Sequence, residues 1–291
     1  AATIGDAWTR SVAIATQRPL PKVQSEPLRC GVLAISLLIA AQTPEHLDLA
    51  SNGFVLLSAA LVLMMTPALA LFYSGFVRGR NVLNTMMMSF SAMALVGVLW
   101  MLVGYSLAFS PGSGPFAPFI GGLQWAGIPN WAEPSLTAPA ISHGSFALFQ
   151  ATFAIITPAL VSGAVVERLN FRAWLLFVLA WTFVVYIPLA HMVWGGGFIA
   201  QHIGAIDFAG GFVVEMASGV AAAVAAMVVG RRLQHPSHVA PPHNVPFILM
   251  GAGLLWFGWY GFNGGSALAS GQLASLGCLT TNTAGAAAAL V

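Results

Sequence analysis

Residues 54–73 read FVLLSAALVLMMTPALALFY, a stretch of twenty residues without a charged side chain. About twenty mainly apolar residues are what an α-helix needs to cross the hydrocarbon core of a bilayer. Six more such stretches follow, uncharged except for Glu215, at 82–109, 146–166, 173–194, 212–230, 245–262 and 266–291. We therefore expect an all-α membrane protein, a polytopic helical bundle with seven spans in this chain.

The composition excludes a soluble protein. Charged residues make up 6% of the 291 residues and hydrophobic residues 58%, whereas a soluble domain is about a quarter charged. Lipid must therefore be the solvent for much of the surface. Two cysteines, Cys30 and Cys278, are too few for a disulfide framework or a zinc site. We expect no metal, no cofactor, no nucleic-acid partner and no enzymatic activity.

The connections between the stretches predict the orientation. Those at 110–145, 195–211 and 263–272 contain no lysine or arginine. The connections after the first, third and fifth stretches carry six arginines: Arg78, Arg80, Arg168, Arg172, Arg231 and Arg232. Basic residues favour the cytoplasmic side. We therefore expect the cell (inner) membrane, with the N-terminus of the mature protein outside.

The first part of the chain predicts a targeting segment. Arg29 precedes an apolar run at 30–41, which is too short to span a bilayer and is followed by small residues. This order is typical of a secretory signal peptide, here at 28–42. An upstream extension from a misplaced start codon is the alternative. We accordingly separate an N-terminal extension, 1–42, from a membrane domain at 43–291.

Asp207 and Glu215 are the two ionisable residues expected at membrane depth. Inserting a charged side chain at the centre of a membrane helix costs about 2.5–3.5 kcal/mol. Asp207 opens the fifth helix, where a carboxylate can cap free N–H groups or help to hold a cation through nearby carbonyls. Glu215 lies two turns deeper. Desolvation there favours a neutral or proton-sharing carboxyl, which suits either a proton relay or a structural contact with the backbone.

Aromatic residues recur at helical spacing in two stretches. Phe149 and Phe153 are one turn apart in the third stretch, while Trp256, Trp259 and Phe262 line the sixth. Such stripes commonly face lipid or the core. Near an external vestibule, however, tryptophan faces attract cations, and composition alone does not choose between these interpretations.

Seven short motifs occur in order: MTPALALFYSG at 65–75, NVLN at 81–84, GAVVER at 163–168, AHMVWGGG at 190–197, DFAGG at 207–211, PHN at 242–244 and WYGFNGGS at 259–266. Together, over 53–291, they resemble the ammonium transporter (Amt/Mep/Rh) family, Amt/Mep type. The resemblance implies an eleven-helix subunit with an external N-terminus, assembled as a homotrimer with one pore per subunit. About seven of the eleven helices would then be present, and the chain would be truncated at its C-terminus.

The resemblance also implies a site. Trp194 and Ser266, with Phe149, would bind ammonium in an external vestibule. Phe153 and Phe262 would form a stacked gate behind them.

Deeper residues complete the expected path. Trp259 would wall a narrow channel, and Asp207 would match an acid needed mainly to hold the backbone of the site. Most family members carry a pore histidine where this chain has Glu215. Its histidine partner belongs to a tenth helix that this chain does not reach. Glu215 would then act as a proton relay with that absent histidine.

The expected function is transport of ammonium or methylammonium: recruitment of the ion, deprotonation, and conduction of NH3 and a proton through an apolar pore. A PII-type regulatory protein is a possible partner at the cytoplasmic face. An ammonium sensor of the same fold, a non-conducting fragment and an unrelated secondary transporter are the alternatives. The sequence downstream of this chain would separate them.

Overall fold

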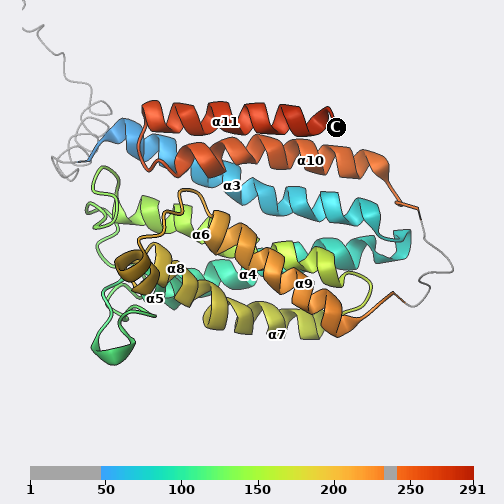
Figure 1. Ribbon diagram of the computed structural model, residues 1–291, viewed down its shortest axis with the longest axis horizontal. Helices are drawn as coiled ribbons and strands as arrows, with labels where there is room; N and C mark the ends of the chain where they lie inside the picture. Colours follow the sequence, from blue (N-terminus) through green and yellow to red (C-terminus); the bar gives the residue numbers. More distant parts are fainter. Residues whose placement is uncertain (1–46, 233–240) are drawn as a thin grey trace, which may run out of the picture. The chain divides into compact units, whose positions relative to one another are not determined.

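The computed structural model describes residues 47–232 and 241–291 (Figure 1). The predicted signal peptide and the whole extension at 1–42 lie outside the described residues. In the described part, the regular elements are all helices, and a single β-bridge joins Pro134 and Ser142. The predicted all-α class is confirmed.

Six helical stretches of the described residues are long and apolar enough to cross a membrane. They are Leu49–Phe76, Gly79–Phe109, His143–Val165, Phe171–Val193, Gly211–Val229 and Val245–Gly264. They coincide with the first six stretches that the sequence predicts. At 1.5 Å per residue even the shortest is close to the thickness of a bilayer core, about 30 Å.

Several of these stretches change helix type along their length. Four contain a π-helical turn, a feature frequent at functional sites. In order, the elements are α3 (Leu49–Phe76); η1 (Gly79–Asn81), α4 (Val82–Leu99), η2 (Trp100–Gly104) and α5 (Tyr105–Phe109); η3 (Gly114–Phe116); α6 (His143–Val165); α7 (Phe171–Trp181), η4 (Thr182–Tyr186) and α8 (Ile187–Val193); η5 (Ile199–Ile203); η6 (Gly211–Met216) and α9 (Ala217–Val229); α10 (Val245–Trp259) and η7 (Tyr260–Gly264); and α11 (Gln272–Ala289). The π-helical turns are η2, η4, η6 and η7 within the spans, and η5 in a connection.

The predicted seventh span differs from the expectation. Residues 266–291 do form a helix, α11 (Gln272–Ala289), but it is not among the six stretches that are apolar enough to cross a membrane. Its sequence begins with Gln272 and carries the polar run 280–283, TTNT. These residues lower the mean hydropathy of the helix, which is otherwise mainly leucine and alanine.

Helix α6 is the central element of the bundle. Most of its length is buried, and it packs against α3, α4 and α9. Helix α10 runs alongside α3 (Figure 1), and glycines on α10 allow the two backbones to approach closely. A Cβ atom added at Gly251 would lie 2.5 Å from the backbone nitrogen of Phe72, and one at Gly258 would lie 2.9 Å from the carbonyl oxygen of Leu61. Small residues serve this purpose in membrane helix pairs.

Side chains cap the first turns of four helices. Asp48, Ser142, Asn170 and Asn244 each accept a hydrogen bond from a backbone N–H at the start of α3, α6, α7 and α10. Each cap satisfies a donor that the helix itself leaves free. These contacts fix where four of the six spans begin.

Glu167 joins three connections at one end of the bundle. Its Oε1 accepts hydrogen bonds from the backbone N–H of Arg78 at 2.9 Å and from the side-chain amide of Asn81 at 2.7 Å. Its Oε2 lies 3.5 Å from the guanidinium of Arg232. The φ angle of Glu167 is 65°, a strained backbone that persists where surrounding contacts determine it. The arginine-bearing connections that the sequence assigns to one side therefore meet here.

His191 ties together the other ends of the helices. Its Nδ1 lies 2.9 Å from the carbonyl oxygen of Ala108, and its Nε2 lies 2.9 Å from that of Ala117. The backbone N–H of Phe198 donates to the carbonyl oxygen of Pro118 at 2.7 Å. The segment after α5 is thereby held against the end of α8.

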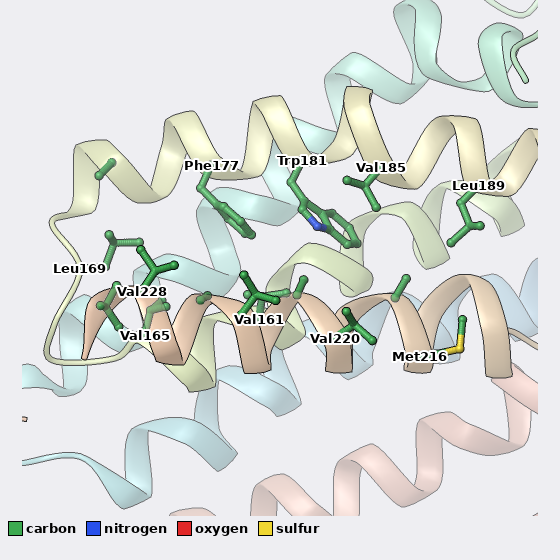
Figure 2. Close-up of a pocket in the computed structure, with 16 residues that line it drawn as sticks. Val161, Val165, Leu169, Phe177, Trp181, Val185, Leu189, Met216, Val220 and Val228 are labelled. Atoms are coloured by element: carbon green, nitrogen blue, oxygen red, sulfur yellow. The ribbon is translucent and has the colours of Figure 1, made fainter. Parts of the chain in front are cut away.

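A cavity of about 600 Å³ between α7, α8 and α9 is lined entirely by apolar residue types. Figure 2 shows Phe177, Trp181 and Val185 directed toward Val220 and Met216 across the gap. Its lining includes no carboxylate, hydroxyl or amide side chain. It therefore lacks the groups that recognise a polar solute, and the candidate site lies elsewhere.

Candidate functional site

A cavity of about 270 Å³ lies where residues after α8 and η7 meet α6. The lining residues are Thr137, Phe146, Phe149, Gln150, Phe153, Trp194, Ile206, Asp207, Phe208, Ser266 and Leu268. We call this space the vestibule cavity. It brings together five of the eight site residues that the sequence singles out: Phe149, Phe153, Trp194, Asp207 and Ser266.

Trp194 follows the last residue of α8, and its indole ring makes one hydrogen bond and one aromatic contact. Its indole Nε1–H donates to the backbone carbonyl of Asp207 at 2.8 Å. The ring of Phe153 meets the indole edge to face, with centroids 6.1 Å apart and planes at 84°. These two contacts fix the orientation of the indole at the wall of the cavity.

Ser266, two residues after η7, supplies a hydroxyl to the wall of the vestibule cavity. Its Oγ–H donates to the carbonyl oxygen of Phe262 at 2.7 Å. Because a hydroxyl has one donor and two lone pairs, the oxygen of Ser266 can still accept. With the indole of Trp194, the cavity offers an aromatic surface and an acceptor, a combination that suits a small cation with N–H groups.

Three phenylalanine rings pack in series from the cavity into the bundle. The centroids of Phe149 and Phe153 are 4.9 Å apart, and those of Phe153 and Phe262 are 4.4 Å apart. All three side chains are buried. Rings at this separation are in contact, so a hydrated ion cannot pass between Phe153 and Phe262 until they move.

Asp207 folds its side chain over the start of the fifth span. One carboxylate oxygen accepts from the N–H of Gly210 at 2.7 Å, and the other accepts from those of Phe212 at 3.0 Å and Val213 at 2.9 Å. Gly210 has a φ of 125°, which lets the chain turn beneath the carboxylate. The predicted capping geometry is present, although the carboxylate reaches forward from three residues before the cap position.

Glu215 lies in the π-helical turn η6 and does not line the vestibule cavity. Its Oε2 is buried and has no hydrogen-bond partner among the described residues. The carboxyl lies over Gly210, where an added Cβ would come within 3.3 Å of Oε2. The contact with a backbone carbonyl that a purely structural role requires is therefore not made by this oxygen.

Trp259 lies beyond Phe262, at the inner end of the phenylalanine series. Trp259 contacts Phe262, with centroids 5.5 Å apart, and lines a separate cavity of about 360 Å³ between α10 and α11. A further cavity of about 410 Å³ extends from Asp207 to Asn263 and Thr280. The structure thus brings Trp259 next to Phe262, one of the two predicted gate residues, but not to the vestibule cavity.

Comparison with known proteins identifies the family. The sequence profile of the Ammonium Transporter Family matches residues 53–291. The chain belongs to this family.

Relatives of this ammonium transporter family member include an ammonium transporter of Bacillus subtilis, 48% identical over 242 residues, which cover 83% of this chain and 58% of the relative. A putative ammonium transporter of Methanothermobacter thermautotrophicus is 48% identical over 244 residues. Among solved structures, Candida albicans Mep2 superimposes with a TM-score of 0.74 at 36% identity, covering 82% of this chain and 52% of Mep2. The chain therefore spans little more than half the length of these relatives.

Family membership and the six apolar helices make the chain part of a multi-pass membrane protein. Sequence reasoning missed two polar residues of the vestibule cavity, Thr137 in the connection before α6 and Gln150 on α6. Gln150 is the more informative of the two. It is the one carboxamide within the apolar stretch 146–166. Burying an uncharged amide without a partner also costs free energy, so a search widened from ionisable to all polar side chains would have found it.

Proposed function

We propose that the complete protein, of which this chain is a part, transports ammonium across a cell membrane. The observation that carries the proposal is the vestibule cavity, in which Trp194 and Ser266 lie next to the packed rings of Phe153 and Phe262. Membership of the Ammonium Transporter Family supports it, as does the naming of its relatives as ammonium transporters. Those relatives are membrane transporters and not enzymes.

Recognition begins in the vestibule cavity. An ammonium ion loses hydrating water there and gains the indole face of Trp194, with the ring of Phe149 close by. A cation at an aromatic face gains about 0.5–2 kcal/mol, more when water is excluded. The hydroxyl oxygen of Ser266 accepts one of its N–H groups. The carboxylate of Asp207 holds the backbone in place, because its lone pairs are already engaged by three N–H groups.

Phe153 and Phe262 act as the gate between this cavity and the interior. A small uncharged molecule needs little ring movement to pass, whereas a hydrated ion needs a much wider opening. Moving a bare charge through an apolar interior is costly. The ion therefore gives up its proton, and NH3 crosses the apolar section that Trp259 helps to wall.

Glu215 handles the released proton. Its buried Oε2 lacks a partner among the described residues, which leaves it free to accept and return a proton. Its counterpart in the relay is a histidine in the part of the protein beyond this chain. The pair would carry the proton along the path that NH3 follows.

The orientation follows from the arginine-bearing connections that meet at Glu167, which we place on the cytoplasmic side of the cell (inner) membrane. The mature N-terminus is then outside. We further propose a homotrimer and a PII-type protein as a regulatory partner at the cytoplasmic face. Chemical crosslinking of the purified complete protein, with and without such a partner, tests both.

The transport proposal is tested with the complete protein, expressed in cells whose own ammonium transporters are deleted. We expect saturable uptake of labelled methylammonium that unlabelled ammonium inhibits. Trp194→Leu removes one cation–aromatic contact. The apparent affinity for methylammonium should therefore weaken about tenfold. Trp131→Leu is the matched control, because that tryptophan is 67% exposed and does not line the cavity.

Absence of methylammonium uptake by a protein that reaches the membrane would contradict the proposal. An ammonium-dependent signalling response in such cells, without uptake, would instead support the sensor alternative. Equal uptake by wild type and Trp194→Leu would remove the vestibule cavity from the mechanism while leaving transport itself intact.

A further inference from the structure

Gln150 occupies the same helix face as the phenylalanines of the vestibule cavity. Residues 146, 149, 150 and 153 follow the i, i+3, i+4, i+7 spacing that places side chains on one side of an α-helix. All four line the cavity. Gln150 is thus a polar group inserted into an otherwise aromatic wall, next to Phe149 and one turn before Phe153.

The carboxamide oxygen of Gln150 is buried and makes no hydrogen bond to the described residues. The residue is 8% exposed, and its Oε1 has no partner among the described residues. Buried polar atoms are nearly always paired, so an unpaired amide in a cavity wall calls for a reason. A ligand that supplies the missing partner is such a reason.

Three polar groups of the surrounding segments make their hydrogen bonds within the protein itself. The hydroxyl of Thr152 donates to the carbonyl oxygen of Phe149 at 2.6 Å. The indole N–H of Trp194 and the carboxylate of Asp207 are occupied as described above. None of these contacts involves the amide of Gln150, which remains available to a molecule in the cavity.

We propose that Gln150 is a recognition residue for ammonium, whose carboxamide oxygen accepts an N–H hydrogen bond from the ion in the vestibule cavity. This inference rests on the transport function proposed above. The last torsion of a glutamine side chain turns readily, so either amide atom can face the cavity, and a cation selects the oxygen. With Ser266 Oγ, the ion would then have two directional acceptors besides the indole face.

The chemistry of a neutral acceptor suits a transporter. An ammonium ion carries four N–H donors and loses several water partners on entering the cavity. A carboxamide oxygen replaces one of them through its dipole, without the full charge that would retain the ion. Methylammonium has one N–H fewer and a methyl group, so it depends less on the acceptor. Gln150 is therefore expected to set the preference for ammonium over methylammonium.

The test uses the complete protein and compares Gln150→Leu with wild type. Initial rates are measured for ammonium and for methylammonium over a range of concentrations. We expect the half-saturation concentration for ammonium to rise about tenfold, equivalent to about 1.4 kcal/mol, with maximal rate changed less than twofold. The half-saturation concentration for methylammonium should rise less, so that the preference for ammonium falls.

Gln272→Leu is the matched control, since Gln272 is exposed at the start of α11 and does not line the vestibule cavity. It should leave both half-saturation concentrations unchanged. Gln150→Glu is the second variant, in case the leucine variant fails to reach the membrane. Its negative charge should lower the half-saturation concentration for ammonium and slow the maximal rate, because the ion is held more tightly.

The inference is overturned if Gln150→Leu, present at the wild-type level, leaves the half-saturation concentration and the ammonium preference unchanged. It is also overturned if only maximal rate falls, equally for both substrates, because that result indicates a structural role. Failure of the wild-type protein to transport either substrate would instead overturn the proposed function. The two failures are therefore distinguishable.

Discussion

Glu167 Oε1 lies 3.0 Å from Nε of Arg78, across 89 residues of chain. The contact links the turn after α3 to the turn after α6. The side chain of Glu167 is 3% exposed, whereas that of Arg78 is 31% exposed. The carboxylate is therefore the buried centre of this junction, and the surrounding donors keep it ionised.

The junction predicts a pH dependence of stability. Burial by itself raises the pKa of the Glu167 carboxyl. Hydrogen bonds from the Arg78 backbone, the Asn81 amide and the Arg78 guanidinium, with the charge of Arg232, outweigh it and lower the pKa from 4.5 to about 2. Since the pKa is lower in the folded state, the stabilisation is complete above about pH 4.5 and is lost as pH falls toward 2.

Glu167→Gln should remove this contribution. Leaving the surrounding donors without a charged acceptor costs about 3 kcal/mol, so the melting temperature of the detergent-solubilised protein should fall at pH 7. The difference from wild type should shrink as pH falls from 4.5 toward 2. Glu133→Gln, at an exposed carboxyl on the segment before α6, should retain the wild-type profile. A constant difference at every pH would contradict the assignment.

Gly251 should not tolerate a larger side chain. An added Cβ would lie 2.5 Å from the backbone nitrogen of Phe72 and 2.8 Å from the carbonyl oxygen of Ala68. Because backbone cannot move aside as a side chain can, Gly251→Val should separate α10 from α3 and cost at least about 1–3 kcal/mol. Thermal melting and the yield of folded protein measure the effect.

Gly253 provides the matched comparison two residues further along α10. No atom lies within 4 Å of a Cβ added there, so Gly253→Val should leave stability almost unchanged, because valine has a slightly higher helix propensity than glycine. Similar losses for both variants would show that the close approach of α3 and α10 does not determine stability.

His191 should be required to hold the segment after α5. Its ring contacts the carbonyl oxygens of Ala108 and Ala117, each at 2.9 Å. His191→Phe keeps the ring but removes both polar contacts. Hydrogen exchange of the backbone amides at 112–122 should then become faster, while exchange in α6 stays slow. His202→Phe, at an exposed histidine in η5, should leave exchange in that segment unchanged.

The spans could be predicted because their cause is local. Twenty uncharged apolar residues, such as 54–73, need no knowledge of neighbours to indicate a membrane helix. The grouping of Arg78 with Arg168 was equally accessible, since their position between spans places them on one side. The seventh stretch forms a helix as predicted, but the polar run at 280–283 lowers its hydropathy, so its crossing of the membrane stays a prediction.

The site was harder to predict because its contacts join distant residues. Nothing in the sequence near Gln150 shows that its amide oxygen lacks a partner. That depends on which side chains from distant segments, such as Trp194 and Ser266, line the same cavity. The π-helical turn that carries Glu215 is likewise invisible in the hydropathy pattern. The roles of the eight predicted site residues came from resemblance to a family, and the structure brings five of the eight together in one cavity.

Asp207 should act through backbone geometry. Its carboxylate accepts three N–H groups at the start of η6, and its carbonyl accepts from Trp194. Asp207→Ala removes the three acceptor contacts and should abolish uptake through displacement of Trp194. Asp207→Asn retains one side-chain oxygen and should keep measurable uptake with reduced thermal stability. An alanine variant with wild-type stability and no uptake would instead indicate direct contact with the ion.

Glu215→Gln should separate proton handling from solute passage. Glutamine keeps the size of the side chain in η6 but cannot gain or lose a proton. Uptake of methylammonium by the complete protein should therefore slow at least about tenfold and lose much of its dependence on pH between 5 and 8, because a positioned proton-transfer group contributes about 100-fold or more. Glu133→Gln should keep the wild-type rate and pH profile, since that residue is exposed and lies in the connection before α6, outside the apolar helices. Unchanged, equally pH-dependent uptake in Glu215→Gln would remove this residue from the relay and leave a structural role beside Gly210.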